Sequence, residues 1–242
     1  MQTNAAEVVR VHDLTHDVRE IDLRLISPAT LDFQAGQFIS FEIPIKGKPY
    51  PLTRAYSIAS PPSRRDHLTL IFNRIDHGPG STFLFGLKPG DQVQFKGPAG
   101  SFRLRDDAPR NLLFVATGTG IAPIRSMLHT LLPQATQQVM SLLWGLRAQR
   151  DLYYQEELHE LAARHPMFHS TVTLSRPDPG WTGPTGRVTA LVQERVKTVD
   201  NLAVYLCGNG GMIKDVTDFL RSNGLCPIYR EKWYDEEEKN EE

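Results

Sequence analysis

The chain has 242 residues, of which 40% are hydrophobic and 23% charged, as is ordinary for a globular protein with one large or two small domains. No stretch reaches the roughly 18 apolar residues of a membrane helix, and the first residues lack the apolar run of a secretory signal. Two cysteines, Cys207 and Cys226, make neither a disulfide framework nor a metal cluster. We therefore expect a monomeric protein of a reducing, cytoplasmic compartment, with no metal and no membrane contact.

The net charge of −1 is unevenly distributed along the chain. Residues 235–242 hold six acids and one lysine, a net of −5, which leaves +4 on the rest of the chain. This tail has no apolar residues to bury, so we expect it to be disordered. A body of +4 is too weakly basic to indicate nucleic-acid binding, but it suits an acidic protein partner.

The first hundred residues predict a closed, all-β unit. Short runs of apolar and alternating residues are separated by Gly, Pro, Asp and Ser, as in an antiparallel barrel. The strands are expected within residues 8–14, 20–27, 36–45, 55–60, 68–75 and 91–102.

A charged segment containing Pro109, residues 102–111, predicts a linker, and beyond it strands alternate with helices. Such alternation is typical of βαβ units in a parallel sheet. Strands are expected at 111–117, 138–145, 169–175, 202–208 and 227–234, and helices at 123–132, 151–165, 185–196 and 212–224. The predicted domains are an N-terminal antiparallel β-barrel, 1–105, an α/β parallel-sheet domain, 111–234, and the tail, 235–242.

Two glycine-containing segments each follow a predicted parallel strand, where α/β sheets bind their ligands. One is GTGIAP, residues 118–123, which also opens a helix whose N-terminus favours a pyrophosphate. The other is CGNGGM, residues 207–212. Read singly, the first is also compatible with a plain strand–helix turn, and Cys207 with a buried structural cysteine.

The barrel half contains two further candidates. Arg54, Tyr56 and Ser57 combine a phosphate-binding fork, a flat ring for stacking and a hydroxyl. In HGPGST, residues 77–82, Ser81 and Thr82 predict a helix N-terminus with bare amides, a second anion site. The first could equally be a surface arginine with a half-buried tyrosine, and the second a capped surface turn.

RAYSIAS (54–60), HGPGST, GTGIAP and CGNGGM follow one another in the order, and at about the separations, found in the ferredoxin–NADP⁺ reductase superfamily. From residue 8 to residue 234 the chain resembles a compact bacterial-type member without a fused iron–sulfur domain. The resemblance implies an FAD-binding barrel followed by a nicotinamide-nucleotide-binding domain, with electrons passing between NADPH and a one-electron carrier.

The resemblance also implies roles for residues of the FAD site. Arg54, beside Ala55, would contact the FAD pyrophosphate, Tyr56 would stack on the isoalloxazine, and Ser57 would hydrogen-bond near flavin N5, which takes the hydride. Trp233 could cover the other face of the flavin, or simply close the last strand. The remaining implied FAD contacts are Ala55, Asn73 and Arg74 beside the ribityl chain and phosphates, the amides of Gly80, Ser81 and Thr82, and Thr119.

For the nicotinamide nucleotide, the resemblance implies that Cys207 lies near nicotinamide C4, with Tyr56 and Ser57 as the other catalytic residues. Ser175, Arg176 and Arg187 resemble a 2′-phosphate site, which favours NADPH over NADH. The other implied nucleotide contacts are Gly118, Thr119, Gly120, Ile121, Ala122, Pro123, Gly145, Arg147, Gly208, Asn209 and Met212. The roles of Asp151 and Tyr153 stay open, since Tyr154 has the spacing that the family's Asp-x-x-Tyr would require.

The electron acceptor is expected to be a separate acidic ferredoxin or flavodoxin, since no ferredoxin-type cysteine spacing is present. Lys46, Lys48, Arg64 and Arg65 flank the flavin motif and could receive it, or could be merely solvated. Two alternatives remain. One is an NADH-dependent reductase component of an oxygenase, or a free flavin reductase; the other is a non-catalytic electron-transfer or regulatory subunit of a larger complex.

Overall fold

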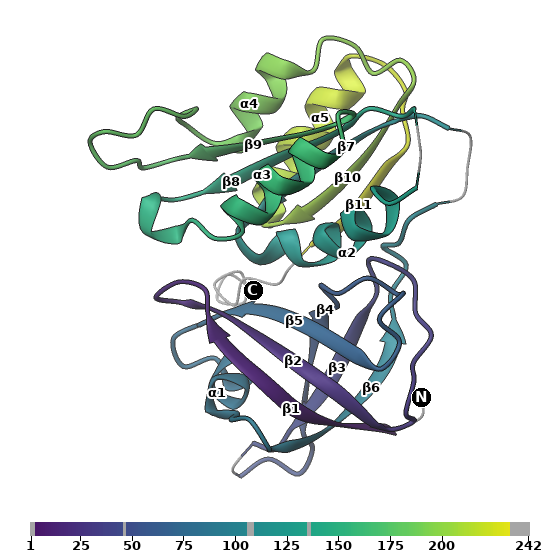
Figure 1. The fold of residues 1–242 in the computed structure, drawn as a ribbon. Coiled ribbons are helices and arrows are strands. Elements are labelled where there is room, and N and C mark those ends of the chain that lie inside the picture. The colour runs from purple at the N-terminus through teal and green to yellow at the C-terminus, as the bar shows by residue number, and fades with distance from the viewer. Residues whose placement is uncertain (1–2, 46, 106–108, 135–136, 233–242) are drawn as a thin grey trace. The chain divides into compact units, whose positions relative to one another are not determined.

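The computed structural model describes residues 3–45, 47–105, 109–134 and 137–232 (Figure 1). By their contacts the residues form two compact units, one of residues 1–105 with 125–133 and the other of 106–124 with 134–242. Residues 125–133, which follow the first strand of the second half of the chain, are thus grouped with the first unit. The sequence-based domain boundaries stay a prediction, and the acidic tail lies outside the described residues.

The first unit is built on a six-stranded sheet in the order β4-β3-β6-β1-β2-β5, with every pairing antiparallel. An isolated bridge between Ile58 and Leu70 joins the segment after β4 to β5, so the two edge strands meet and the sheet closes. The predicted antiparallel barrel is confirmed. Its elements are β1 (Thr3–Asp13), β2 (Val18–Ser27), β3 (Phe38–Ile43), β4 (Leu52–Ser57), β5 (His67–Asn73), α1 (Pro79–Gly86) and β6 (Gln92–Ala99).

Alternation along the strands builds the core of the first unit. In β1, Asn4, Ala6 and Val8 are buried while their neighbours are partly exposed, the period of two expected of a strand with one face inside. Phe41 and Phe95 meet in this core at 6.5 Å between ring centroids, in an edge-on arrangement. Burying each such ring stabilises the fold by about 2–3 kcal/mol.

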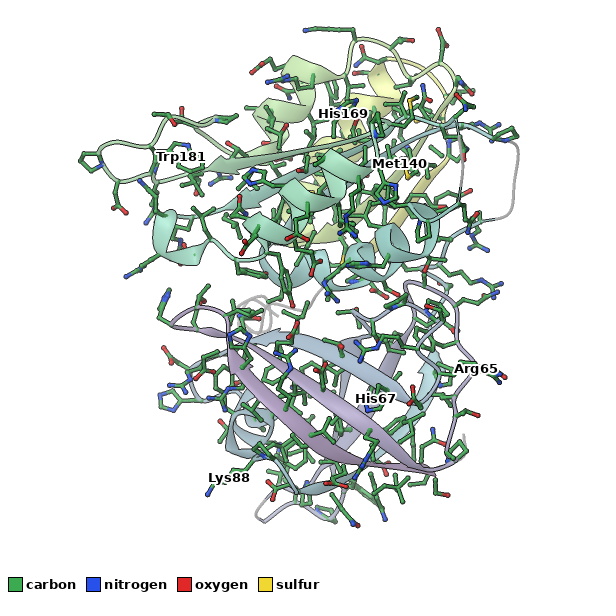
Figure 2. All side chains as sticks on the ribbon, viewed as in Figure 1. Arg65, His67, Lys88, Met140, His169 and Trp181 are labelled. Atoms are coloured by element: carbon green, nitrogen blue, oxygen red, sulfur yellow. The ribbon has the colours of Figure 1, made fainter. Side chains whose placement is uncertain are left out.

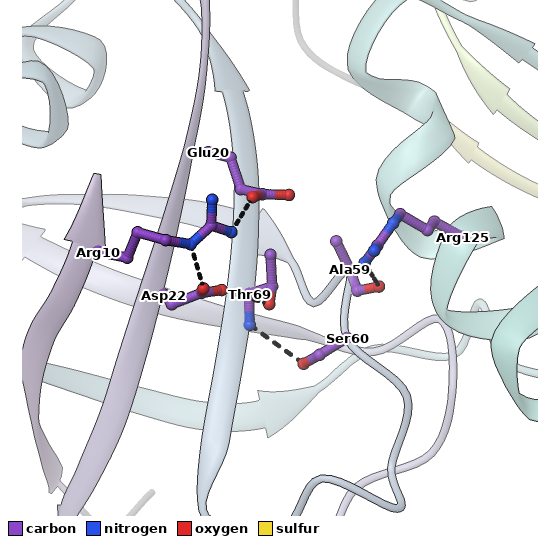
Figure 3. Close-up of polar contacts among 7 residues, drawn as sticks. All are labelled: Arg10, Glu20, Asp22, Ala59, Ser60, Thr69 and Arg125. Carbon is purple, nitrogen blue, oxygen red and sulfur yellow. Dashed lines mark hydrogen bonds and ion pairs between the residues drawn. The ribbon is translucent and has the colours of Figure 1, made fainter. Parts of the chain in front are cut away.

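A buried polar network crosses the first unit (Figure 3). Asp22 accepts from Arg10 Nε at 2.7 Å and from the Thr69 hydroxyl at 2.6 Å, and Arg10 also pairs with Glu20. The Thr69 amide donates to the Ser60 hydroxyl at 3.1 Å. Because both oxygens of Asp22 accept hydrogen bonds, these bonds offset the cost of burying its carboxylate.

Helix α2 (Ile121–Leu131) anchors the loop that follows β4. Arg125 donates to the Ala59 carbonyl at 3.1 Å (Figure 3). The buried Ser126 hydroxyl donates to the Ser60 carbonyl at 2.7 Å. The loop's two carbonyls are therefore satisfied by consecutive side chains of one helix, which fixes the path of the chain just beyond Ser57.

The second unit has a five-stranded, wholly parallel sheet in the order β11-β10-β7-β8-β9. The expected parallel α/β domain is confirmed. Its strands and remaining helices are β7 (Asn111–Thr117), η1 (Gly118–Gly120), β8 (Met140–Leu146), η2 (Gln149–Asp151), α3 (Gln155–Arg164), β9 (Phe168–Leu174), α4 (Val188–Arg195), β10 (Leu202–Gly208), α5 (Gly210–Ser222) and β11 (Ile228–Lys232).

Strand order in this sheet reverses between β7 and β10. The chain runs outward from β7 through β8 to β9, and then returns to place β10 on the other side of β7. Helices α4 and α5 pack on one face, where Val192 and Val216 join the apolar core over Val115. The carboxyl ends of β7 and β10 thus form the topological switch point, where open α/β sheets bind their ligands.

The α-helices of the described residues all begin earlier or later than the sequence predicts: α4 starts at Val188 rather than at residue 185, and α5 at Gly210 rather than at Met212. Helix α1 starts at Pro79 rather than Ser81, and α2 starts at Ile121 after a 3₁₀ turn rather than at Pro123. Helix α3 starts only at Gln155 because Tyr154 is left-handed, with φ of 55°. None of the helices in the described part of the chain is long and apolar enough to span a bilayer.

Candidate cofactor-binding sites

The two flavin motifs of the sequence meet in the first unit at Gly80. A Cβ atom on Gly80 would lie 2.5 Å from the Tyr56 hydroxyl and 3.0 Å from Arg54 Cγ, so only glycine fits there. The Tyr56 ring packs against Phe41 and Phe72, at 5.9 Å between centroids in each case. Strand β4 therefore presents Arg54 and Tyr56 directly beside the first turn of α1.

The first turn of α1 offers two amides for an anion. Pro79 has no amide hydrogen, and the Thr82 amide already donates to the Gly78 carbonyl at 2.9 Å. The amides of Gly80 and Ser81 precede the first helical acceptor and make no bond within the helix. Thr82, exposed, contributes at most its hydroxyl to a ligand.

The Ser81 hydroxyl holds the loop before α1, a role that the sequence did not indicate. It donates to the Ile75 carbonyl at 2.9 Å and accepts from the Ile75 amide at 3.1 Å. It also lies 3.1 Å from the Gly78 carbonyl. Because this side chain is buried and engaged with its own loop, Ser81 can serve an anion only through its main-chain amide.

Arg74 lies with its guanidinium carbon 4.6 Å from the Phe85 ring centroid, and Arg19 lies over the same ring at 4.6 Å. Arg19 also donates to Asp13 at 2.6 Å, and this hydrogen bond holds the pKa of the Asp13 carboxyl below its ordinary value of 3.8. Arg74 forms no ion pair with any described residue. Asn73, at the end of β5, reaches only the Arg74 carbonyl, at 3.5 Å.

In the second unit the GTG turn packs tightly against the end of β10. A Cβ atom on Gly120 would lie 2.3 Å from the Cys207 carbonyl oxygen, and Gly118 is left-handed with φ of 50°. Gly120 is therefore required by a neighbouring strand of the same chain, in addition to any ligand. Ile121, Ala122 and Pro123 are buried, so a ligand would meet their backbone rather than their side chains.

The end of β10 is tied to the end of β7 through Thr117. The Asn209 amide donates to Thr117 Oγ1 at 3.1 Å, and the Asn209 side chain caps α5 by accepting from the Met212 amide at 2.8 Å. Gly208 has φ of 151°, and a Cβ atom on it would lie 2.1 Å from Thr117 Oγ1. Cys207 is 1% exposed, and Met212 belongs to the apolar core beneath.

Three exposed arginines gather around the ends of β8 and β9. The Arg176 amide donates to the Arg147 carbonyl at 2.7 Å, and Arg187 is the N-cap residue of α4. The turn before Arg187 is fixed to β9, since Thr173 Oγ1 donates to the Gly186 carbonyl at 2.9 Å. Within the described residues none of the three guanidiniums forms an ion pair, so their charges remain available to an anion.

The loop between Ser175 and Arg187 is held at both ends. Gln149 accepts from the Asp178 amide at 2.7 Å and donates to the Asp178 carbonyl at 3.0 Å. Trp181, labelled in Figure 2, donates from Nε1 to the Pro184 carbonyl at 2.9 Å and packs over Gly183. The arginines thus lie at the base of a preorganised loop.

These donor sets fit the two groups that the fold class binds. Around Gly80, a glycine-lined helix start, Arg54 and Arg74 suit a diphosphate beside a stacked ring. At the switch point, the glycines of η1 and β10 let a ligand approach the main chain. The guanidiniums of the three arginines lie around the ends of β8 and β9, the next strands of the same sheet. The donor groups of the first unit therefore fit a flavin nucleotide, and those of the second unit fit a nicotinamide nucleotide.

Sequence reasoning missed several supporting residues. Trp144 Nε1 and the Tyr153 hydroxyl both donate to the Gly118 carbonyl, at 3.0 and 3.1 Å, a contact that the sequence did not predict for either residue. Thr117 and Phe85 were also overlooked. Only the run of aromatic residues after β8 hinted at any of these, because the contacts join segments distant in the chain.

Some expectations cannot be compared with the structure. Trp233 and Lys46 lie outside the described residues. Of the other basic residues proposed to receive a partner, Arg65 pairs with Asp32 at 2.7 Å, while Lys48 and Arg64 are exposed (Figure 2 labels Arg65).

A flavin-type barrel and a dinucleotide-type parallel sheet define an oxidoreductase that uses both kinds of nucleotide. The Oxidoreductase FAD-binding domain family matches residues 5–104, and the Oxidoreductase NAD-binding domain family matches residues 114–218. The chain is 34% identical over 222 residues to ferredoxin–NADP reductase B of Sorangium cellulosum (strain So ce56), covering 89% of this chain and 90% of that protein.

The chain therefore belongs to the ferredoxin–NADP⁺ reductase superfamily, and it is an FAD- and NAD(P)-binding electron-transfer oxidoreductase. It is also 34% identical over 229 residues to DmpP, the reductase component of phenol 2-monooxygenase from Pseudomonas sp. (strain CF600), covering 92% of this chain but only 63% of that protein. A ferredoxin NADP⁺ reductase structure from Neisseria gonorrhoeae shares the fold, with a TM-score of 0.83 at 21% identity, covering 97% of this chain and all of that one.

Proposed function

We propose that the protein transfers electrons between NADPH and a separate one-electron carrier, a ferredoxin or flavodoxin, through hydride transfer to the flavin N5. The observation that carries the choice of NADPH is the group of three exposed guanidiniums, Arg147, Arg176 and Arg187, at the ends of β8 and β9 and the start of α4. A dianionic 2′-phosphate matches their charge, and a bare ribose hydroxyl does not.

FAD, when bound, would supply the two-electron and one-electron chemistry, so the residues of the protein would bind and orient the two nucleotides. Arg54 and the Gly80 and Ser81 amides hold the FAD diphosphate. Tyr56 supports the flavin ring, and Ser57 donates a hydrogen bond near N5. No side chain needs to act as a general acid or base.

For the nicotinamide nucleotide, the GTG turn and the end of β10 bind the diphosphate and the nicotinamide end. Cys207, nearly inaccessible to solvent, shapes the space beside nicotinamide C4. Hydride transfer requires the two rings in van der Waals contact, so ring placement is the main contribution to rate.

The Sorangium relative supports a ferredoxin as the carrier, because it is matched over nearly its whole length. The similarity to DmpP supports the second candidate, the reductase component of an oxygenase. A free flavin reductase and a non-catalytic subunit remain the alternatives expected from sequence, as do the monomeric state and the cytoplasmic location.

Anaerobic reduction of the FAD-loaded protein by NADPH and by NADH, followed in parallel at the flavin absorbance maximum, tests the proposal. We expect bleaching with both nucleotides and a clear preference for NADPH. Steady-state rates with ferredoxin, flavodoxin and free flavin then separate the acceptors. A protein that binds no flavin, or that prefers free flavin strongly over both carriers, contradicts the proposal.

A further inference from the structure

The carbonyl oxygen of Gly118 is the meeting point of three hydrogen-bond donors. The Ile121 amide donates to it within the 3₁₀ turn. Trp144 donates from Nε1 at 3.0 Å and Tyr153 from its hydroxyl at 3.1 Å. The Ile121 amide alone closes the turn, so the two aromatic donors are additional to it and share the two lone pairs of the oxygen with that amide.

Both aromatic donors are held rigidly. Trp144 is fully buried in β8 and Tyr153 is 5% exposed. Their rings meet edge to face, 4.8 Å apart at 89°, a favourable aromatic geometry. The segment that carries Tyr153 is fixed as well, since the Asp151 carboxylate accepts from the Ala148 amide at 2.9 Å.

The bonds to the Gly118 carbonyl act on the peptide unit that it shares with the next residue. In a trans peptide the C=O and the N–H point in opposite directions, so the direction of the carbonyl fixes that of the Thr119 N–H. Gly118 is left-handed, with φ of 50°, and its glycine backbone could rotate readily without such restraint. Donors on the carbonyl also polarise the amide and strengthen its N–H as a donor.

We propose that Trp144 and Tyr153 are positioning residues for the nicotinamide nucleotide: by holding the Gly118 carbonyl they orient the Gly118–Thr119 peptide so that its amide donates to the nucleotide's diphosphate. This inference rests on the proposed function, which assigns the GTG turn to that diphosphate. It adds a role for two side chains that need not touch the nucleotide themselves.

A purely structural role for the pair would give a different result. Buried tyrosine and tryptophan polar atoms usually find a partner, and their loss would then weaken the whole unit evenly. Orientation of one peptide, by contrast, affects a ligand's diphosphate and leaves its other contacts intact. The two roles are separated by comparing a ligand that has the diphosphate with one that lacks it.

The test uses the full-length, FAD-loaded protein and the variant Tyr153→Phe, which removes one hydroxyl and keeps the ring. Dissociation constants for NADP⁺ and for 2′-AMP, which has the 2′-phosphate but no diphosphate, are measured by calorimetry. We expect NADP⁺ to bind about five- to tenfold more weakly, the equivalent of one hydrogen bond, and 2′-AMP to bind unchanged. The FAD content should be the same as in the parent.

Tyr154→Phe is the matched control, because it removes the adjacent hydroxyl without touching Gly118. It should leave the NADP⁺ affinity unchanged. Trp144→Phe, which removes the other donor, should weaken NADP⁺ in the same sense, and a thermal melt identifies any loss of folding in this larger substitution.

Unchanged NADP⁺ affinity in Tyr153→Phe overturns the inference, as does an equal weakening of 2′-AMP or an equal effect of Tyr154→Phe. The proposed function is judged separately on the parent protein. If the parent binds neither NADP⁺ nor NADPH, the proposed function itself fails, whatever the variants do.

Discussion

Gly80 and the Tyr56 hydroxyl are so close that a Cβ atom on the glycine would lie 2.5 Å from the oxygen. The tyrosine cannot easily yield, because its ring packs against Phe41 and Phe72. Two motifs separated by a whole strand in the sequence thus form one continuous surface in the first unit. The first turn of α1 and strand β4 are expected to bind FAD together, and a change in one should be felt by the other.

Gly80→Ala should weaken FAD binding by about tenfold or more, since overpacking of this kind costs about 1–3 kcal/mol and shifts the amides that hold the diphosphate. Titration of the apoprotein with FAD, followed by flavin fluorescence, measures the affinity. Gly86→Ala, in the same helix with open space around the position, is the control and should leave it unchanged. Equal affinity in Gly80→Ala and the parent would show that α1 does not bind the flavin.

Gly120→Ala should destabilise the second unit, because the added methyl group would lie 2.3 Å from the Cys207 carbonyl oxygen and 2.7 Å from its carbon. These are main-chain atoms within a sheet and cannot move away cheaply. We expect the free energy of unfolding to fall by about 2–3 kcal/mol in urea denaturation. Gly211→Ala, where the nearest atom is 3.4 Å away, should change it little. A loss of nucleotide affinity with no loss of stability would mean that Gly120 serves the ligand alone.

Arg176→Ala combined with Arg187→Ala should raise the KM for NADPH by about 100-fold or more and leave that for NADH nearly unchanged, because charge-assisted bonds to a phosphate are worth about 1.5–3 kcal/mol each. Steady-state kinetics with both nucleotides measures the ratio. Arg221→Ala, an exposed arginine near the end of α5, is the control for loss of positive charge. Equal effects on NADPH and NADH would remove the case for 2′-phosphate recognition.

Asp13→Asn should reduce the acid sensitivity of folding. The Arg19 hydrogen bond lowers the pKa of the Asp13 carboxyl in the folded state, so the pair stabilises the fold above the ordinary value of 3.8, and this contribution disappears as the pH falls below it. Asp13 is largely exposed, so the effect is small, about 0.2–1 kcal/mol. Urea unfolding at pH 7 and pH 3 should show a smaller loss of stability for Asp13→Asn at pH 3 than at pH 7. Asp200→Asn should behave as the parent does, and a loss of equal size at both pH values would refute the linkage.

The sequence predicted every strand of the described part of the chain, because strand periodicity and turn residues are local signals. It predicted helix starts less well. Tyr154 adopts a left-handed backbone with φ of 55°, so α3 starts later than expected. The Ser81 hydroxyl bonds to the loop before α1 instead of capping the helix. The backbone conformation and hydrogen-bond partners of such residues depend on their neighbours in the folded protein, which a local sequence pattern does not contain.

The candidate site was predictable only where residues sit in recognisable motifs. The tie of Tyr153 to Gly118 and the closeness of Gly120 to Cys207 arise from pairing of strands that are far apart in sequence. The spacing of Tyr154 left the role of Tyr153 open. A parallel sheet aligns strand ends, but which side chains then meet is determined by register and by helix crossing.

Helix α2 has one more consequence. Its residues 121–124 belong to the second unit and 125–131 to the first, so the boundary between the units runs through a helix rather than through a linker. A gene fragment ending at residue 105 would encode a barrel that lacks Ser126 on the Ser60 carbonyl and Met127 against Gly36. The barrel therefore cannot be separated from the second unit by ending the chain at one position. A domain exchange with a relative would have to transfer helix α2 together with the barrel.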